Sequence, residues 1–323
     1  MQKEICLMSN LSQREMLKQG LVAGIAKGWR GFVWMMKIVV PVSFFTALLA
    51  WSGWMERVDF VIRPVMGFLS LPDIAALPLL IGMLTSIYGG IAAMAVLPLN
   101  VGEMTLIAVF LLIAHNLIQE GIIQGKSGMG GAKATLFRIV SAVITILVIA
   151  PFIDTTGQGG STAMATGIPP VRQALTEMII QWGQVMVELA VKIFFIILCV
   201  LTALELLKTF GLIDRIVRFF SPLLRIMGLG ERVALLWITA AIFGLAYGGA
   251  VIVEEVEKGE LTDDELESLH LSIGINHSMI EDPALFLPFG ISLFWLWIPR
   301  LVLAMIAVRL LALWQRFRRL KKY

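Results

Sequence analysis

Eight long apolar stretches constrain this chain more than any other feature of its sequence. Each approaches or exceeds the roughly 20 residues that a helix needs to cross about 30 Å of hydrocarbon. A backbone inside lipid must satisfy its own hydrogen bonds, so such stretches fold as α-helices. We therefore expect an all-α integral membrane protein. The stretches are residues 31–52, 74–98, 104–122, 134–153, 184–206, 232–253, 266–281 and 284–314.

Composition excludes several other classes of protein. The chain is 58% hydrophobic and 15% charged, whereas soluble domains are about half apolar and about a quarter charged. With only two cysteines a disulfide scaffold is not indicated,. The formal net charge is +3, and the basic residues lie at the ends of apolar stretches, so nucleic-acid binding is not expected,. No hydrolase or nucleotidase motif is present, so we expect neither an enzyme nor a cofactor.

Two further stretches, 54–69 and 212–227, mix arginine and acidic residues with apolar residues at helical spacing. This pattern predicts amphipathic helices that lie on the membrane surface. Such helices could form a scaffold between two copies of the chain, so a homodimer is possible.

The second half of the sequence repeats the first. The matched residues include two of the three histidines and two of the three tyrosines, and the offset between the halves drifts only from 158 to 162 residues. Because rare polar residues are kept twice inside apolar stretches, the duplication points to the functional positions. The matched groups are Tyr88-Gly89-Gly90 with Tyr247-Gly248-Gly249, His115 with His277, Glu120 with Asp282, and Arg138 with Arg300.

The distribution of basic residues predicts how the segments cross the membrane. If all eight stretches span it, the basic loops 122–138 and 207–232 face outward, against the positive-inside tendency,. If 74–98 and 232–253 are re-entrant helical hairpins, both loops and both termini are cytoplasmic. Each repeat then has one surface helix, one hairpin and three full transmembrane helices. An odd number of crossings gives the two repeats opposite orientations, as in many secondary transporters.

This topology divides the chain into five parts. They are a cytoplasmic N-terminal arm (1–30), a first repeat (31–153), a linker (154–181), a second repeat (182–315) and a basic cytoplasmic tail (316–323).

The candidate site consists of ionisable and polar residues in the third helix of each repeat. Ionisable groups inside a membrane are costly and usually functional. On continuous helices these residues form two polar stripes, which inverted repeats would bring to a shared midplane site. The residues are His115, Asn116, Gln119 and Glu120 in the first repeat, and His277, Ser278, Glu281 and Asp282 in the second.

Three kinds of chemistry suit this set. Histidines with carboxylates could relay protons. Histidine and carboxylate also bind divalent transition metals, and the polar groups could hydrogen-bond an organic solute. If a metal binds, the expected ligands are His115, Glu120, His277, Glu281 and Asp282.

Other polar residues are expected to support this site. The hairpin tips should expose backbone groups that bind ions or carboxylates, at Tyr88, Gly89, Gly90, Tyr247, Gly248 and Gly249. Lys192 and Glu188 should pair on one helix face. Arg138 and Arg300 begin the last span of each repeat and are expected to hold the interface, and His270 is expected to have a surface or structural role.

The paired Tyr-Gly-Gly segments, each followed by His-(Asn/Ser)-x-Ile-(Gln/Glu)-(Glu/Asp), resemble the nucleoside-recognition, or Gate, domain family. That family includes spore maturation proteins A and B, and related segments occur in ferrous-iron permeases and concentrative nucleoside transporters. The resemblance implies two Gate units, a bacterial inner-membrane location, and substrate-facing positions around Tyr88, Tyr247, His115 and His277.

These observations predict a secondary transporter that moves a small polar solute, nucleoside-like or another small organic ion, by alternating access. Coupling to protons or another ion is expected. Two alternatives stay open: a divalent-cation permease that uses the same residues, and a membrane scaffold or signalling protein that transports nothing.

Overall fold

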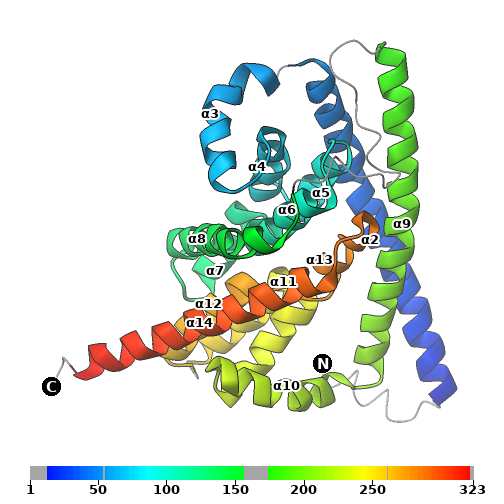
Figure 1. The fold of residues 1–323 in the computed structure, drawn as a ribbon. Helices are drawn as coiled ribbons and strands as arrows, with labels where there is room; N and C mark the ends of the chain where they lie inside the picture. The colour runs from blue at the N-terminus through cyan, green and yellow to red at the C-terminus, as the bar shows by residue number, and fades with distance from the viewer. Residues whose placement is uncertain (1–12, 54, 156–173, 260, 321–323) are drawn as a thin grey trace.

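The computed structural model describes residues 13–53, 55–155, 174–259 and 261–320, and this part of the chain is built from helices (Figure 1). In chain order the elements are α2 (Gln13–Trp51), α3 (Met55–Phe68), η1 (Asp73–Ala75), α4 (Ala76–Leu84), α5 (Ile87–Ala95), α6 (Val101–Ala114), α7 (Leu117–Lys126), α8 (Gly131–Ile149), η2 (Ala150–Phe152), α9 (Leu175–Thr209), α10 (Ile213–Met227), α11 (Glu231–Glu257), α12 (Asp263–Asn276), α13 (Glu281–Ala284), η3 (Leu287–Phe289) and α14 (Leu293–Leu320).

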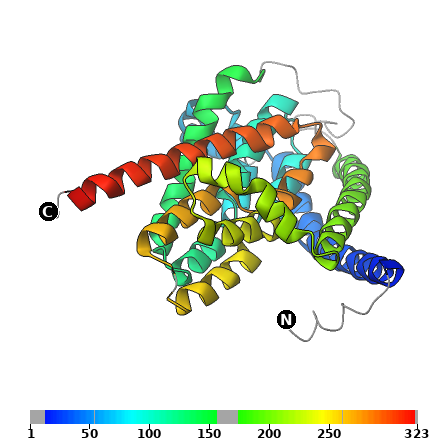
Figure 2. The ribbon, with the colours of Figure 1, turned by 90° about the horizontal axis from the view of Figure 1, so that it is seen from below.

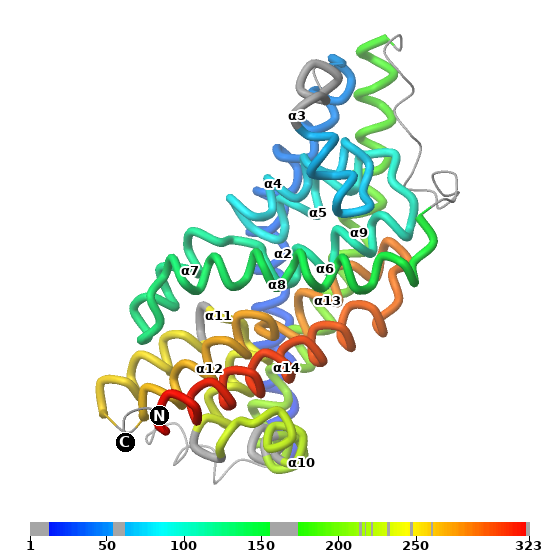
Figure 3. The backbone as a smooth tube through the Cα atoms, turned by 60° about the vertical axis from the view of Figure 1, so that its left-hand side comes forward, coloured from blue at the N-terminus to red at the C-terminus, as the bar shows by residue number. Residues whose placement is uncertain are grey.

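The two longest helices, α2 and α9, pack side by side in opposite directions (Figures 1 and 3). Three glycines spaced four residues apart, Gly20, Gly24 and Gly28, let the helices approach closely,. A Cβ atom on Gly24 would lie 2.6 Å from the Cα of Thr202. At the other end of the pair, α9 donates a hydrogen bond from Trp182 Nε1 to the Ser43 hydroxyl in α2 (3.1 Å).

Helices α2, α9 and α14 are longer than the sequence predicts. Helix α2 already begins at Gln13, so most of the expected cytoplasmic arm is helical. Helix α9 begins at Leu175, inside the expected linker, and α14 continues to Leu320, inside the expected tail. For α2 the cause is packing, because its polar first turns still carry the glycine face that contacts α9. Residues 1–12, 156–173 and 321–323 of these parts lie outside the described residues.

The two predicted amphipathic helices are present as α3 and α10. Helix α10 packs on α11 and α14, and it ends at Gly228 in the left-handed conformation that commonly terminates helices,. Seen from below, α14 runs across the bundle and extends past it (Figure 2).

Both stretches predicted to be hairpins are broken near their middle and fold back on themselves. In the first half the break at Thr85–Ser86 separates α4 from α5. Glycines allow contact between the two arms, since a Cβ on Gly90 would lie 3.3 Å from the Cα of Gly82. In the second half α11 is kinked at Gly244, whose φ is 78°. A Cβ on Gly248 would lie 2.5 Å from the Cα of Ala240.

Five described helical segments are long and apolar enough to cross a membrane. They are Gln13–Trp51, Val101–Lys126, Gly131–Phe152, Leu175–Thr209 and Leu293–Leu320. A sixth can be counted only if the bent segment from Ile62 to Leu84 is one span. The span expected at 266–281 is not among them, because α12 ends at Asn276.

Large apolar side chains cover the outside of these helices. Phe45, Val148 and Val187 are each more than 60% exposed in the isolated chain. Apolar surface of this extent is normal against lipid and unusual against water. Together with the span lengths, it makes the chain a multi-pass membrane protein.

Candidate functional site

The two helices that carry the candidate residues are both interrupted at the histidine. Helix α6 ends at Ala114 and α7 begins at Leu117, while α12 ends at Asn276. The residue after each histidine is left-handed without being glycine: φ is 48° at Asn116 and 47° at Ser278. Backbone conformations of this kind are uncommon and often mark functional positions.

The predicted pair of polar stripes on each helix is therefore wrong. His115 and His277 both have extended backbone and follow the last helical residue. The residues after them leave the helical path, so spacing along a continuous helix does not decide which side chains meet. Propensity did not reveal these interruptions, because neither contains proline or glycine.

The backbone freed at each break is hydrogen-bonded to the neighbouring hairpin. The backbone N–H of Asn116 donates to the Gly82 carbonyl in α4 (2.9 Å), and the backbone N–H of Ser278 donates to the Ala240 carbonyl in α11 (3.1 Å). Buried backbone groups without partners are costly. Break and hairpin are thus joined in the same way in both halves.

A buried arginine binds the carbonyl groups at the end of each interrupted helix. In α8, Arg138 donates from Nε to Ile113 O and from Nη2 to His115 O, both at 2.8 Å. In α14, Arg300 donates from Nε to Ile275 O and from Nη2 to His277 O, both at 3.0 Å. The last carbonyls of a helix lack partners within it, and the planar guanidinium can bind two at once.

The two arginines have a role that the sequence did not indicate. Each binds carbonyls of its own half, and Arg138 also packs against Gly274 of the second half. Both belong to the site, although the predicted site residues did not include them. The usable signal was their spacing, because they recur at the same offset as the histidines.

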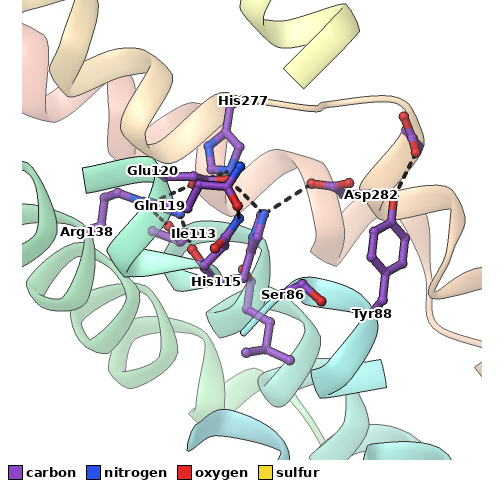
Figure 4. A network of polar contacts seen from close by, with 12 residues as sticks. Ser86, Tyr88, Ile113, His115, Gln119, Glu120, Arg138, His277 and Asp282 are labelled. Carbon is purple, nitrogen blue, oxygen red and sulfur yellow. Dashed lines mark hydrogen bonds and ion pairs between the residues drawn. The ribbon is translucent and has the colours of Figure 1, made fainter. Parts of the chain in front are cut away.

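The two breaks face each other and bring their ionisable side chains into one buried network (Figure 4). Glu120 is at its centre. Its Oε2 lies 2.6 Å from Arg138 Nη1 and 3.3 Å from His277 Nε2, and its Oε1 lies 3.2 Å from His115 Nε2. Asp282 Oδ2 is 3.7 Å from the same His115 nitrogen. The two imidazole ring centroids are 5.0 Å apart.

The hydrogen bonds of the histidines assign their protons. His115 Nδ1 lies 2.7 Å from Leu111 O, and His277 Nδ1 lies 3.0 Å from Ile273 O. A carbonyl oxygen only accepts, so both Nδ1 atoms carry a proton and, in neutral rings, both Nε2 atoms carry a lone pair. These lone pairs would face carboxylate oxygens. Each such contact is attractive only when a proton lies between the nitrogen and the oxygen.

Three of the five residues predicted as metal ligands have ligand atoms close together. One atom each from His115, His277 and Asp282 lies within 4.8 Å of the others. Glu120 also contacts both imidazoles but is paired with Arg138, and Glu281 bonds Tyr88 instead.

Tyr88 and Glu281 meet beside the network rather than inside it. The Tyr88 hydroxyl, which points away from the histidines (Figure 4), donates to Glu281 Oε1 (3.1 Å). Trp34 packs edge-on against the Tyr88 ring at 5.4 Å. They border a cavity of about 370 Å³ between α2, α5, α9 and α13. Because Glu281 precedes Asp282 in the chain, the cavity adjoins the buried network.

The remaining predicted residues lie elsewhere. Asn116 Nδ2 donates to Gln119 Oε1 (3.3 Å), and Gln119 is exposed outside the network. The four predicted glycines do not form exposed hairpin tips. They are buried about one helical turn after each chain reversal. A Cβ there would contact the facing arm of the hairpin or a neighbouring helix, as at Gly89, Gly90, Gly248 and Gly249. The Tyr247 side chain lies outside the described part of the structure.

Two supporting predictions have clear outcomes. Lys192 pairs with Glu188 at 2.6 Å on the exposed face of α9, as predicted. His270 is fully buried and its Nε2 bonds the Ser127 carbonyl (2.7 Å), so its role is structural and not at the surface.

Comparison with known proteins supports the membrane character of the chain. It is 27% identical over 311 residues to the uncharacterized membrane protein YvoD of Bacillus subtilis, a match that covers 94% of this chain and 97% of the relative. No family model matches the sequence. No solved structure matches it either.

Proposed function

We propose that this protein is a secondary transporter of the bacterial inner membrane that moves a small polar solute by alternating access and couples it to protons. One observation carries the proposal. Two interrupted helices, one from each half of the chain, meet at a buried network of Glu120, His115 and His277. Interrupted helices that meet inside the membrane are the usual binding site of secondary transporters.

The arrangement of the halves supports alternating access. Each half contains a long helix, an amphipathic helix, a hairpin, an interrupted helix and a final helix, in that order. The long helices α2 and α9 run antiparallel, as inverted repeats require. In this proposal the hairpins are re-entrant, and the site opens alternately to the two sides of the membrane.

The surroundings of His115 support proton coupling. Its Nε2 lies 3.2 Å from Glu120 Oε1 and 3.7 Å from Asp282 Oδ2, so a proton on this nitrogen would be stabilised by both carboxylates. Imidazole exchanges protons near neutral pH. A change in the distance between His115 and Glu120 would therefore bind or release a proton, which is how solute movement and proton movement can be linked.

The direct test is proton flux in proteoliposomes. The purified protein would be reconstituted with a pH-sensitive dye inside, and uridine, leucine and succinate would be added one at a time under an imposed pH gradient. We expect one of these solutes to cause proton entry, and His277→Gln and Asp282→Asn to abolish it. His270→Gln is the matched control, since this buried histidine lies outside the network. Solute-dependent proton entry that is unchanged in both site variants would contradict the proposal.

A divalent-cation permease is the second candidate, supported by the close ligand atoms of His115, His277 and Asp282. Two imidazoles and one carboxylate suit a transition metal. Against it, the Arg138 guanidinium lies 2.6 Å from Glu120, so a positive charge already stands beside the group that would bind the cation. Metal analysis of purified protein after incubation with Mn²⁺, Fe²⁺ or Zn²⁺ separates the two. Stoichiometric metal that is lost in Asp282→Asn favours the permease.

A further inference from the structure

The cavity beside the buried network has walls of distinct chemistry. Lys27, Arg30 and Trp34 line it from α2, Tyr88 from α5, Leu201 from α9 and Glu281 from α13. Its volume of about 370 Å³ lies within the range of small-molecule sites,. It therefore offers cationic, anionic, aromatic and aliphatic groups around one space.

The two cations of the cavity differ in their partners. Lys27 Nζ lies 3.4 Å from Glu205 Oε2, so its charge is partly balanced within the protein. Arg30 donates from Nε to the Ala26 carbonyl of its own helix, and among the described residues it pairs with no carboxylate. Its remaining guanidinium donors are available to a ligand. A planar guanidinium matches a carboxylate in geometry and charge.

Glu281 is the anion among the lining residues. It accepts one hydrogen bond, from Tyr88, through Oε1. A carboxylate has two oxygens that can each accept more than one hydrogen bond. The Trp34 ring, which packs on Tyr88, also attracts cations through its π face,. The surroundings of Glu281 therefore suit an ammonium group.

We infer that the cavity binds a small zwitterion, with its carboxylate on Arg30, its ammonium on Glu281 and an apolar side chain against Leu201, as in an aliphatic α-amino acid. The inference rests on the proposed transport function, because it names the solute that the buried network would couple to protons. Arg30 directly precedes the apolar stretch 31–52. The cavity is therefore on the predicted cytoplasmic side.

Three probes that differ by one charged group test this pairing. Leucine carries both groups, isocaproate lacks the amine, and isoamylamine lacks the carboxylate. Binding would be measured by calorimetry on the full-length protein in phosphatidylcholine nanodiscs. We expect leucine to bind more tightly than either analogue by roughly tenfold or more, since each loses a charge-assisted hydrogen bond.

The variants assign each end of the ligand. Arg30→Gln should weaken leucine binding and make it no tighter than isoamylamine binding, while leucine still binds more tightly than isocaproate. Glu281→Gln should make leucine bind no more tightly than isocaproate, while leucine still binds more tightly than isoamylamine. Lys18→Gln and Glu257→Gln remove exposed charges outside the cavity and should leave all affinities unchanged. Loss of both preferences in both variants, or no preference in the native protein, overturns the inference.

A lipid headgroup could supply the same two charges. Nanodiscs that contain phosphatidylethanolamine therefore form a separate arm, and abolition of leucine binding there would assign the cavity to lipid and overturn the inference. Binding and transport fail independently. Leucine that binds as predicted without any proton flux contradicts only the proposed function, whereas proton flux with another solute that Arg30→Gln and Glu281→Gln leave unchanged contradicts only the zwitterion site.

Discussion

Arg138 Nη1 lies 2.6 Å from Glu120 Oε2, and both side chains are buried among the interrupted helices. The equivalent residues of the second half, Arg300 and Asp282, form no such ion pair in the described structure. Asp282 Oδ2 instead lies 3.7 Å from Nε2 of His115 in the first half. The two halves share one sequence pattern but differ in how their charges are paired.

The buried pair should be strongly coupled. Glu120→Gln leaves the Arg138 charge without its partner, and breaking a buried ion pair from one side typically costs about 3–5 kcal/mol. The double variant Glu120→Gln/Arg138→Met should recover part of this loss. Thermal unfolding of the native protein, the single variants Glu120→Gln and Arg138→Met, and the double variant in detergent gives the coupling. The exposed pair of Lys192 and Glu188, also at 2.6 Å, is the control and should couple by less than about 1 kcal/mol,. Equal coupling in the two pairs would contradict the role of burial.

Arg300 should not be replaceable by lysine. Its guanidinium bonds two carbonyls at the end of α12, whereas an ammonium is a point charge without the planar fork. Arg300→Lys should lower the free energy of unfolding by about 1–3 kcal/mol, the cost of unpaired buried polar groups. Arg309→Lys is the control, because Arg309 also bonds carbonyls but does so at the exposed surface. A similar loss in both variants would contradict a special role for Arg300.

The glycine face of α2 should tolerate no side chain. In Gly24→Ala the added Cβ would lie 2.6 Å from the Thr202 backbone, so α2 and α9 would have to separate. We expect a lower midpoint of thermal unfolding. Gly183→Ala in α9 is the control, since nothing lies within 4 Å of its added Cβ. That change should be neutral or stabilise the helix by roughly 0.5–1 kcal/mol. Destabilisation by Gly183→Ala, or none by Gly24→Ala, would show that the helices pack differently.

The left-handed backbone at the second break should depend on residue type. Ser278 has a φ of 47°, a conformation that glycine adopts freely and β-branched residues strongly avoid. Ser278→Val should therefore destabilise the protein by about 1–3 kcal/mol, while Ser278→Gly keeps the fold. Comparing the two variants by thermal unfolding separates backbone strain from loss of the hydroxyl. If valine and glycine have equal effects, strain is not stored at this position.

Much of the fold could be predicted from the sequence because a lipid environment leaves few options. The apolar stretches predicted the helices, and the amphipathic stretches predicted α3 and α10. Both hairpins fold at the predicted segments. Gly244 permits the turn in the second hairpin, and glycines in both let the two arms come into contact. Helix ends were harder to predict. The polar start of α2 is ordered by packing against α9, which hydropathy does not record.

The site was predicted in content better than in geometry. Duplication identified His115, Glu120, His277 and Asp282, and the structure places these four side chains together. The interruptions at Asn116 and Ser278 were missed because they arise from tertiary hydrogen bonds to the hairpins. For the same reason the carbonyl contacts of the two arginines were missed. Their partners are backbone carbonyls, which become available only once the helix has ended.

The hydrogen bonds from Asn116 to Gly82 and from Ser278 to Ala240 have a mechanical consequence. Each break is fastened to the hairpin of its own half, so a displacement of the hairpin acts directly on the break. The imidazoles of His115 and His277 lie between the two breaks, with ring centroids 5.0 Å apart. A shift of one break relative to the other would therefore change the separation of the imidazoles and the carboxylates, and with it the contacts that a proton can bridge.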